Sequence, residues 1–421
     1  MIFFLVFYFF LILFFYQYSN GFRFGVVSFV FTLYFLSSVT SFVLGWFSVY
    51  EFELDLEPTI FYIFSISVVF IGFSYYKDFS FECIAINNIR FIKLFESFFI
   101  FLSVFSVFFF CFTAYEVFNV SDSIEDTRNM IASGIYSPLE KYGIYNSFFS
   151  LIANLFILNI IFFFLNLIDD YPSGSKTKAV VHLFASFSYV LYILSYMGRD
   201  GFVFWAITIF FIYLIFKGFL RAGIVFFVRR IFLILVSLLL IPFSIITYSR
   251  FSSTGSLLSV FDYFGQQIFN FNAHYKVDAP IEHGNISFAP VVRFFKMITN
   301  EDYESFNRVE WFSYFLDNDV VPWVFATFLG SFLHDFGRVG VLIAAFLIMI
   351  MLTATLRSLA KNGLIKFSNL LFFIVLTQIV TWGVFYYRQY SAFYYLLFMF
   401  CFFCFLKFSG RTKTIFLHKL R

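Results

Sequence analysis

Charged residues are scarce in this sequence. Of its 421 residues only 13% are Asp, Glu, Lys or Arg, whereas 61% are hydrophobic and 78 are phenylalanine. A soluble globular protein needs far more polar surface than this to cover its core, so the composition excludes that class. The net charge of +3 gives no basis for a nucleic-acid partner, and we expect none.

Cysteine and the familiar cofactor motifs are also scarce. Two of the four cysteines, Cys401 and Cys404, have CxxC spacing, but they lie inside an apolar run. Small apolar filler is the simpler interpretation of that pair than a metal or redox site. The sequence contains no Gly-rich phosphate loop, HExxH motif or nucleophile elbow. We therefore expect no bound metal and no cofactor.

Long apolar runs are abundant instead. Many are about 17–22 residues long, the length that an α-helix needs to cross the hydrocarbon layer of a membrane. They do not alternate as the strands of a barrel would. The runs predict an all-α, polytopic helical membrane protein with about 11 (10–12) transmembrane helices. They cover residues 1–17, 24–46, 59–76, 94–115, 145–167, 179–197, 202–217, 231–249, 339–356, 368–386 and 391–406. A further run, 323–333, is too short to cross and fits a re-entrant or interfacial helix.

The distribution of Lys and Arg predicts the topology. Six segments on one side hold 18 of the 28 basic residues, whereas the other side holds 20 of the 25 acidic residues. Basic loops stay in the cytoplasm, so the N-terminus is predicted outside and the C-terminus inside. The six segments are the loops with Arg23, with Lys77 to Lys93, with Lys176 and Lys178, with Lys217 to Arg230 and with Arg357 to Lys366, and the tail from Lys407.

The same pattern divides the chain into three parts. Residues 1–249 hold the first eight transmembrane helices, and residues 250–322 form a large outer loop in which we expect short helices. Residues 323–421 hold the re-entrant segment, the last transmembrane helices and a basic cytoplasmic tail. A loop as long as 250–322 without low-complexity character is usually functional.

Four arginines lie where an apolar segment meets the outer side, the side that positive charge avoids. They are Arg199, Arg250, Arg338 and Arg388. Charge at this boundary is costly without a partner and often marks a functional site. Each also has an ordinary interpretation as an interfacial anchor. Arg199 precedes Asp200, with which it can pair, and Arg388 lies among tyrosines that favour cation–π packing.

The segment from Thr327 to Gly340 is the most unusual in the chain, because it gathers His334, Asp335, Arg338 and three glycines at the outer end of an apolar run. If it is helical, His334 and Arg338 share a face. Asp335 and Arg338 are three residues apart, a spacing at which they can neutralise each other. His334, Asp335 or a carboxylate of the large loop could act as a general base. The adjacent Glu282 and His283 of that loop could also be a solvated pair.

Arginines at this depth suit one kind of ligand. A guanidinium binds phosphate through paired, planar hydrogen bonds and keeps its charge. A diphosphate attached to a long lipid tail places its anion at the membrane boundary, with the tail in the bilayer. Arginines around it would stabilise the charge that develops on a leaving diphosphate.

Three short motifs carry a family resemblance. They are Gly198-Arg199-Asp200-Gly201, Tyr248-Ser249-Arg250, and Phe328-Leu329-Gly330 followed by Asp335-Phe336-Gly337. With the many spans, the high aromatic content and the large late outer loop, the chain resembles the Wzy-type oligosaccharide repeat-unit polymerases of bacterial O-antigen or capsule synthesis. Over most of the chain, the resemblance is one of architecture.

The resemblance implies a function. The enzyme would transfer a growing glycan from undecaprenyl diphosphate to another lipid-linked repeat unit, without metal, at the periplasmic face of the bacterial inner membrane. The resemblance implies that Arg199 and Arg250 bind the diphosphate and that His334 is catalytic. On the residue pattern described above, we add Arg338 and Arg388 to the diphosphate site and Asp335 to the catalytic site. A chain-length regulator would be a protein partner, and the large outer loop would be periplasmic.

Two other functions stay open. An O-antigen ligase or another lipid-diphosphate glycosyltransferase would use the same substrate. A polysaccharide flippase or transporter belongs to a different class and should place charges in mid-membrane, in broken helices. The predicted spans hold almost no charge, and Glu96 is expected near an inner end.

Overall fold

A computed structural model describes most of the chain. The described residues are 2–20, 25–47, 54–74, 82–121, 126–127, 130–131, 136–137, 140–172, 174–198, 200–251, 256–302, 307–321, 324–360, 363–387, 393–408 and 414–419.

The structure is mostly helical, and each of the eleven predicted apolar segments contains a helix. Among the described residues, six helices are long and apolar enough to cross a membrane. A seventh candidate is the pair α6 (Gly143–Asn154) and α7 (Phe156–Asn166), which are bent by 43° relative to each other. These helices indicate a helical membrane protein, whereas the number of eleven crossings stays a prediction. The six cover Val26–Trp46, Leu56–Phe73, Ile89–Phe118, Lys176–Leu194, Asp200–Phe219 and Thr327–Arg357.

The chain forms two compact units. Unit 1 comprises Met1–Ser80, Thr254–Asn362 and Leu371–Met399, and unit 2 comprises Phe81–Ser253, Gly363–Leu370 and Phe400–Arg421. The units are not consecutive in the sequence, because the first three helices pack with helices that follow residue 254. The predicted division into 1–249, 250–322 and 323–421 stays a prediction. Helices α17 (Phe367–Trp382) and α18 (Phe393–Phe408) each belong partly to both units.

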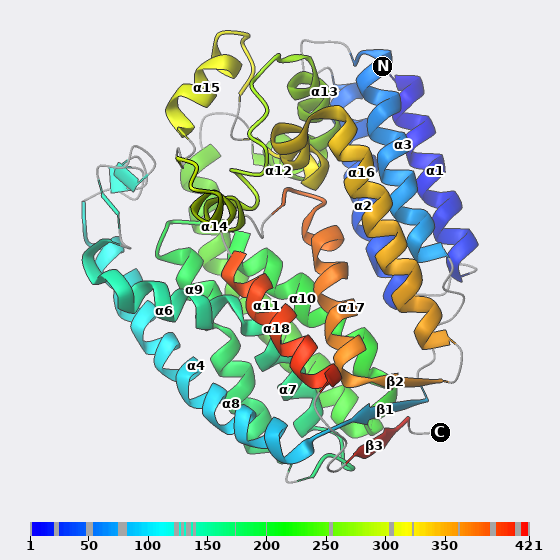
Figure 1. The fold of residues 1–421 in the computed structure, drawn as a ribbon, viewed down its shortest axis with the longest axis vertical. Helices are drawn as coiled ribbons and strands as arrows, with labels where there is room; N and C mark the ends of the chain where they lie inside the picture. Colours follow the sequence, from blue (N-terminus) through cyan, green and yellow to red (C-terminus); the bar gives the residue numbers. More distant parts are fainter. Residues whose placement is uncertain are drawn as a thin grey trace. The chain divides into compact units, whose positions relative to one another are not determined.

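Unit 1 is built on long helices that lie side by side (Figure 1). They are α1 (Ile2–Asn20), α2 (Val26–Trp46), α3 (Leu56–Ser74) and α16 (Thr327–Ala360). Helix α1 packs on α2, and α3 packs on α16. A Cβ on Gly72 of α3 would lie 3.0 Å from the Cα of Met349 in α16. A glycine at this crossing therefore lets the two backbones approach closely, as is common between membrane helices.

The predicted large loop contains four short helices, as expected. They are α12 (Ser256–Gly265), α13 (Gln267–Lys276), α14 (Ala289–Thr299) and α15 (Arg308–Leu316). The first two are packed into the helix bundle. Ser41 of α2 donates a hydrogen bond of 2.7 Å to the carbonyl of Gly265. Helix α13 is buried along most of its length, and its Asn272 donates to the Asp55 carbonyl at 3.1 Å and to Thr59 at 3.0 Å.

Helix α16 is broken near its start. Gly337 has φ 65° and ψ −172°, a conformation essentially restricted to glycine. Residues 327–336 before the break correspond to the short segment predicted at 323–333, and the long arm after it holds the predicted run 339–356. The start of α16 is tied to the end of α17, since the Thr327 and Phe328 amides donate to the carbonyls of Phe385 and Gly383, both at 2.9 Å.

Unit 2 contains the remaining helices and a small sheet. The helices are α4 (Ile89–Phe118), α6, α7, α8 (Lys176–Ser186), α9 (Ser188–Leu194), α10 (Asp200–Phe216) and α11 (Ala222–Phe251), with the 3₁₀ turns η1 (Glu140–Tyr142) and η2 (Lys217–Phe219). Helix α4 turns phenylalanines such as Phe101 and Phe108 outward and buries Ser103 and Ser106. Apolar residues outside and polar residues inside are the arrangement expected where lipid is the solvent.

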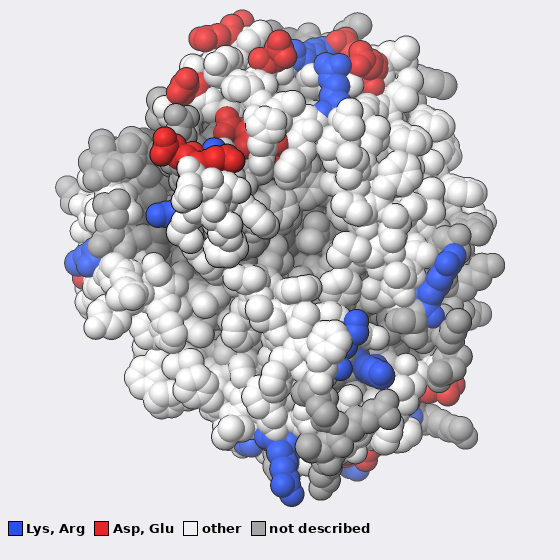
Figure 2. Space-filling model, viewed as in Figure 1, with Lys and Arg blue, Asp and Glu red and all other residues white. Residues whose placement is uncertain are grey.

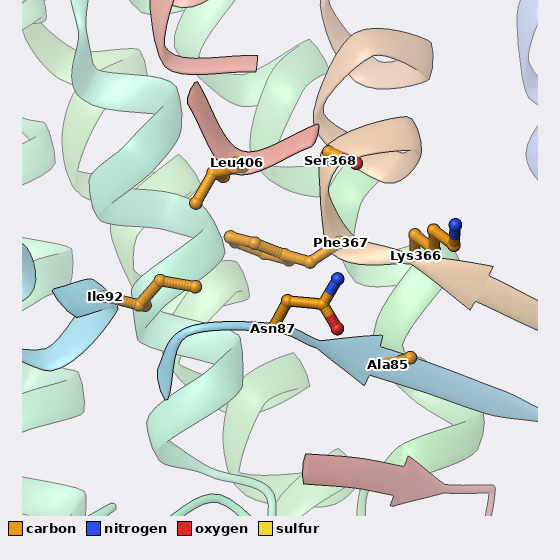
Figure 3. Close-up of a pocket in the computed structure, with 7 residues that line it drawn as sticks. All are labelled: Ala85, Asn87, Ile92, Lys366, Phe367, Ser368 and Leu406. Atoms are coloured by element: carbon orange, nitrogen blue, oxygen red, sulfur yellow. The ribbon is translucent and has the colours of Figure 1, made fainter. Parts of the chain in front are cut away.

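A small sheet that the sequence analysis did not predict accompanies the helices. Its strands are β1 (Cys83–Ile86), β2 (Leu364–Lys366) and β3 (Ile415–His418), in the order β2-β1-β3. Strand β1 pairs in parallel with β2 and antiparallel with β3. All three strands come from segments that were predicted to share the cytoplasmic side. Beside the sheet, Asn87, Ile92 and Phe367 line a small pocket at the starts of α4 and α17 (Figure 3).

Charge is distributed unevenly within each unit. In unit 1, Asp and Glu gather at the end where α13 and α15 lie (Figure 2). The described acidic residues of the segments around this end are Asp55, Glu57, Asp278, Glu282, Glu301, Asp302, Glu310, Asp317 and Asp319. In unit 2, the strands are bordered by Lys366 and Lys419. These acidic residues and lysines lie on segments that the sequence predicts on opposite sides of a membrane, and that topology stays a prediction.

Candidate active site

Two histidines meet in unit 1. His274 lies on α13, and His334 lies on the arm of α16 before the break. Nδ1 of His274 is 3.0 Å from Nε2 of His334. Nε2 of His274 is 3.0 Å from the carbonyl oxygen of Val321. His274 is buried, whereas His334 is partly exposed.

The hydrogen bonds fix the positions of the protons. A carbonyl only accepts, so Nε2 of His274 carries a hydrogen and donates it to Val321. In a neutral imidazole the other nitrogen is then an acceptor, so Nδ1 of His274 accepts a hydrogen from Nε2 of His334. The free lone pair of His334 is consequently on its Nδ1. Among the described residues, no group forms a hydrogen bond with this nitrogen, so its lone pair is free to accept a hydrogen bond from a ligand.

Burial keeps His274 neutral. It lowers the pKa of His274 from its ordinary value to about 4, against a smaller opposing effect of the hydrogen bond to Val321. A neutral His274 can accept the hydrogen of His334 at every pH near neutrality. No sequence pattern pointed to His274, because its partner lies sixty positions away and α13 falls within the predicted large loop.

Helix α15 forms an aromatic wall over the pair. Trp311 and Phe315 are four residues apart and share one face of this helix. Their rings meet the His334 ring edge to face, at centroid distances of 4.7 and 5.1 Å. Phe315 also contacts His274, at 5.1 Å. The wall restricts the orientation of both imidazoles and keeps water from one side of them.

Asp335 has a positioning role in the structure. It is fully buried, and its two carboxylate oxygens accept hydrogen bonds from the amides of Ile286 and Ser287, at 2.9 and 2.7 Å. The amide of Glu282 donates to the His334 carbonyl at 3.1 Å. Asp335 thus holds the segment 281–288 against the arm of α16. With both oxygens engaged, it is less suited than His334 to the catalytic role predicted for it.

Glu282 is a second acid–base group near the pair. Burial raises the pKa of its carboxyl group, and the charge of Asp335 raises it further. Its neighbour His283 is exposed. Of the adjacent residues Glu282 and His283, the carboxyl group is therefore partly buried beside the site, whereas the histidine is solvated.

The break at Gly337 overturns the expectation that His334 and Arg338 share a helical face. Arg338 follows the break and is directed elsewhere. Its guanidinium is 3.3 Å from the Glu57 carboxylate and 4.1 Å from the centre of the Tyr275 ring. It is not paired with Asp335, whose partners are the backbone amides. With a side chain 55% exposed, Arg338 keeps N–H groups available for an anion.

The other three predicted arginines are not described at the level of their side chains. Arg199 and Arg388 lie outside the described residues, and the side chain of Arg250 lies outside them as well. The backbone gives their context: α10 begins at Asp200, and α11 ends at Phe251. The predicted cluster of four arginines stays a prediction.

Among the described residues, no group of three or more His, Cys, Asp or Glu side chains is placed to hold a metal ion. Compared with models of known families, with curated proteins and with solved structures, the chain matches none. The interpretation of the site therefore depends on its own geometry and chemistry.

Proposed function

We propose that the protein is a membrane glycosyltransferase that polymerises oligosaccharide repeat units carried on undecaprenyl diphosphate, with His334 as the general base. The product would be an O-antigen or capsular polysaccharide. One observation carries the proposal. The bonds from Val321 through His274 to His334 leave Nδ1 of His334 as an unprotonated acceptor, at the end of unit 1 where Arg338 also lies.

The transfer needs one base and a stabilised leaving group. Nδ1 of His334 would take the proton of a sugar hydroxyl on the acceptor repeat unit, whose oxygen then attacks the anomeric carbon of the donor. The bond from that carbon to the diphosphate oxygen breaks, and its electron pair stays with the diphosphate. Arg338 and the predicted arginines Arg199, Arg250 and Arg388 would stabilise the charge on that leaving group. The proton on His334 is then lost to water.

The proposed topology has eleven crossings, an outer N-terminus and a large periplasmic loop in the bacterial inner membrane. It is supported by the sheet, which joins three segments predicted to be cytoplasmic. It is also supported by the acidic end of unit 1, since the positive-inside pattern leaves acidic loops on the outer side. A chain-length regulator protein would be the partner that sets polymer length.

A flippase or transporter is the second candidate, and one observation favours it. Glu96, the charged residue expected near the inner end of a span, is buried in α4 together with His182 of α8. An O-antigen ligase shares the donor substrate and stays a third candidate. A single genetic experiment separates the three.

The experiment is deletion of the gene followed by electrophoresis of lipopolysaccharide. A polymerase predicts loss of the ladder of long chains while one capped repeat unit is retained. Loss of all O-antigen would contradict the proposal, because a ligase or flippase is needed for the first repeat unit as well.

Complementation with variants tests the site. His334→Ala should restore protein level but not the ladder, because base catalysis typically contributes about 10²–10⁴-fold to the rate. Arg199→Ala and Arg250→Ala should likewise shorten the chains. His418→Ala changes an exposed histidine of β3 and should restore the full ladder. Full-length chains from His334→Ala would rule out His334 as the base.

A further inference from the structure

Unit 2 contains a buried polar cluster that the proposed function does not use. Its centre is a pair of titratable groups, Glu96 of α4 and His182 of α8, with Nε2 of His182 3.3 Å from Oε1 of Glu96. Both side chains are at most 5% exposed. Asn166 at the end of α7 donates to Oε1 of Glu96 at 2.6 Å, and Tyr171 donates to Oε2 at 2.8 Å.

The pair lies within helices that are long and apolar enough to cross a membrane. Glu96 belongs to the candidate span Ile89–Phe118 and His182 to Lys176–Leu194. A net charge at such a place is expensive, so ionisable residues there pair with each other and usually have a function. The cluster should therefore adopt the protonation state that leaves the pair neutral.

The hydrogen-bond geometry around His182 determines how many protons it shares with Glu96. The amide nitrogen of Asn159 donates to the Ser103 hydroxyl at 2.9 Å, so the Asn159 carbonyl faces Nδ1 of His182, at 3.0 Å. That carbonyl only accepts, and Nδ1 must carry the hydrogen. Nε2 of a neutral His182 would then direct a lone pair at an oxygen of Glu96. One additional proton between Nε2 and Oε1 converts this repulsion into a hydrogen bond.

Few other ionisable groups face the pair. The Tyr171 hydroxyl donates to Glu96, and burial together with Glu96 raises the pKa of that hydroxyl, so it stays protonated. The charge of Lys178, on the first turn of α8, acts on His182 from an exposed position. Neither group supplies the missing proton.

We propose that Glu96 and His182 form a proton-binding site between α4 and α8, which holds one proton and releases it only when the pH rises well above neutrality. The ligand is the proton, shared by a carboxylate and an imidazole. This inference does not depend on the proposed glycosyltransferase activity, because it concerns a cluster in unit 2 and a thermodynamic property.

The proposal predicts how stability depends on pH. Unfolded, Glu and His have pKa values of about 4.3 and 6.5, so above pH 6.5 the unfolded pair holds no proton while the folded pair holds one. Stability should then fall as pH rises, with the folding equilibrium constant changing about tenfold per pH unit. Thermal unfolding of the full chain in detergent micelles, measured from pH 5 to 9, gives the profile.

Two variants should change the decline of stability with rising pH in different ways. Glu96→Gln removes the carboxylate, so the folded state no longer holds an extra proton and the decline above pH 6.5 should disappear. His182→Gln leaves Glu96 to be buried as the protonated acid. The decline should then begin about two pH units lower, near the ordinary pKa of Glu. Effects from histidines elsewhere are common to all three proteins and cancel in the differences.

Glu116→Gln is the matched control. Glu116 lies on the same helix but pairs with the exposed Lys141, at 2.7 Å. This variant should keep the wild-type alkaline decline. If the Asn159 amide were instead rotated by 180°, His182 could donate to Glu96 without an additional proton. Wild-type stability would then be flat above pH 6.5 and would coincide with the Glu96→Gln profile, which would overturn the proposal.

Discussion

His274 links the site to the pH dependence of folding. Burial lowers its pKa to about 4, whereas an unfolded histidine has a pKa of about 6.5. Between these values the unfolded state binds the proton and the folded state does not. The stabilisation is therefore complete above pH 6.5 and is lost as pH falls toward 4. The full difference is on the order of 3 kcal/mol.

Replacing His274 should reduce the loss of unfolding free energy that accompanies the fall in pH. In His274→Asn the unfolding free energy should be lower at pH 7, because two hydrogen bonds are changed, but it should fall less between pH 6.5 and 4.5 than in the wild type. Thermal melts of both proteins at several pH values measure the two slopes. Equal acid slopes would show that His274 accepts a proton in the folded state as readily as it does in the unfolded chain.

Only some residues of the candidate active site could be predicted from the sequence. His334 and Asp335 stood out because an unusual set of polar residues and glycines surrounds them at the end of an apolar run. The role of Asp335 could not be predicted, because it depends on the amides of Ile286 and Ser287, almost fifty positions earlier. His182 and its pairing with Glu96 were also missed, because each residue taken alone resembles an isolated polar residue in an apolar segment.

At the scale of the element, the break in α16 is the feature with the clearest test. Gly337 has a positive φ that a residue with a side chain adopts only under strain. Gly337→Ala should destabilise the protein by about 1–3 kcal/mol. It should also disturb the alignment of His334 with His274, because the arm before the break is oriented by it. A lower melting temperature together with a shortened glycan ladder is expected.

Gly223→Ala provides the comparison. Gly223 lies near the start of α11, and an added Cβ would meet no atom within 4 Å. Alanine favours a helix by about 0.5–1 kcal/mol over glycine, so this variant should be neutral or slightly more stable. Similar destabilisation by both substitutions would indicate that the effect at residue 337 does not arise from its backbone conformation.

Helices were predictable because a long apolar run is a strong signal that does not need tertiary information. The details within them were not. The bend between α6 and α7 and the exact position of the break in α16 arise from packing and from a single glycine conformation. The strands were missed for a different reason. Three or four residues are too few for a periodic pattern, and their partners are distant in the sequence.

At the scale of the whole molecule, the sheet joins parts of unit 2 that the sequence could place only on the same side of the membrane. Leu417 of β3 is fully buried, whereas the adjacent Phe416 is 50% exposed. Leu417→Ala should lower the unfolding free energy by about 2–5 kcal/mol, because it leaves a cavity beside the central strand. Phe416→Ala should cost less than about 1 kcal/mol. Thermal melts in detergent compare the two.

A larger effect of Phe416→Ala than of Leu417→Ala would contradict the described orientation of β3, since a one-residue shift of register would exchange the buried and exposed faces. The comparison therefore tests the pairing of β3 with β1 independently of any activity.

The order of the strands also has a consequence for biosynthesis. Strand β1 is the central strand, yet both of its partners are translated much later, β3 last of all. While the ribosome is still adding the helices between them, both edges of a short, apolar β1 have no partner, and such edges are prone to pair with other chains. The nascent protein would thus depend on a chaperone or on the membrane insertion machinery at this segment until the end of β3 leaves the ribosome.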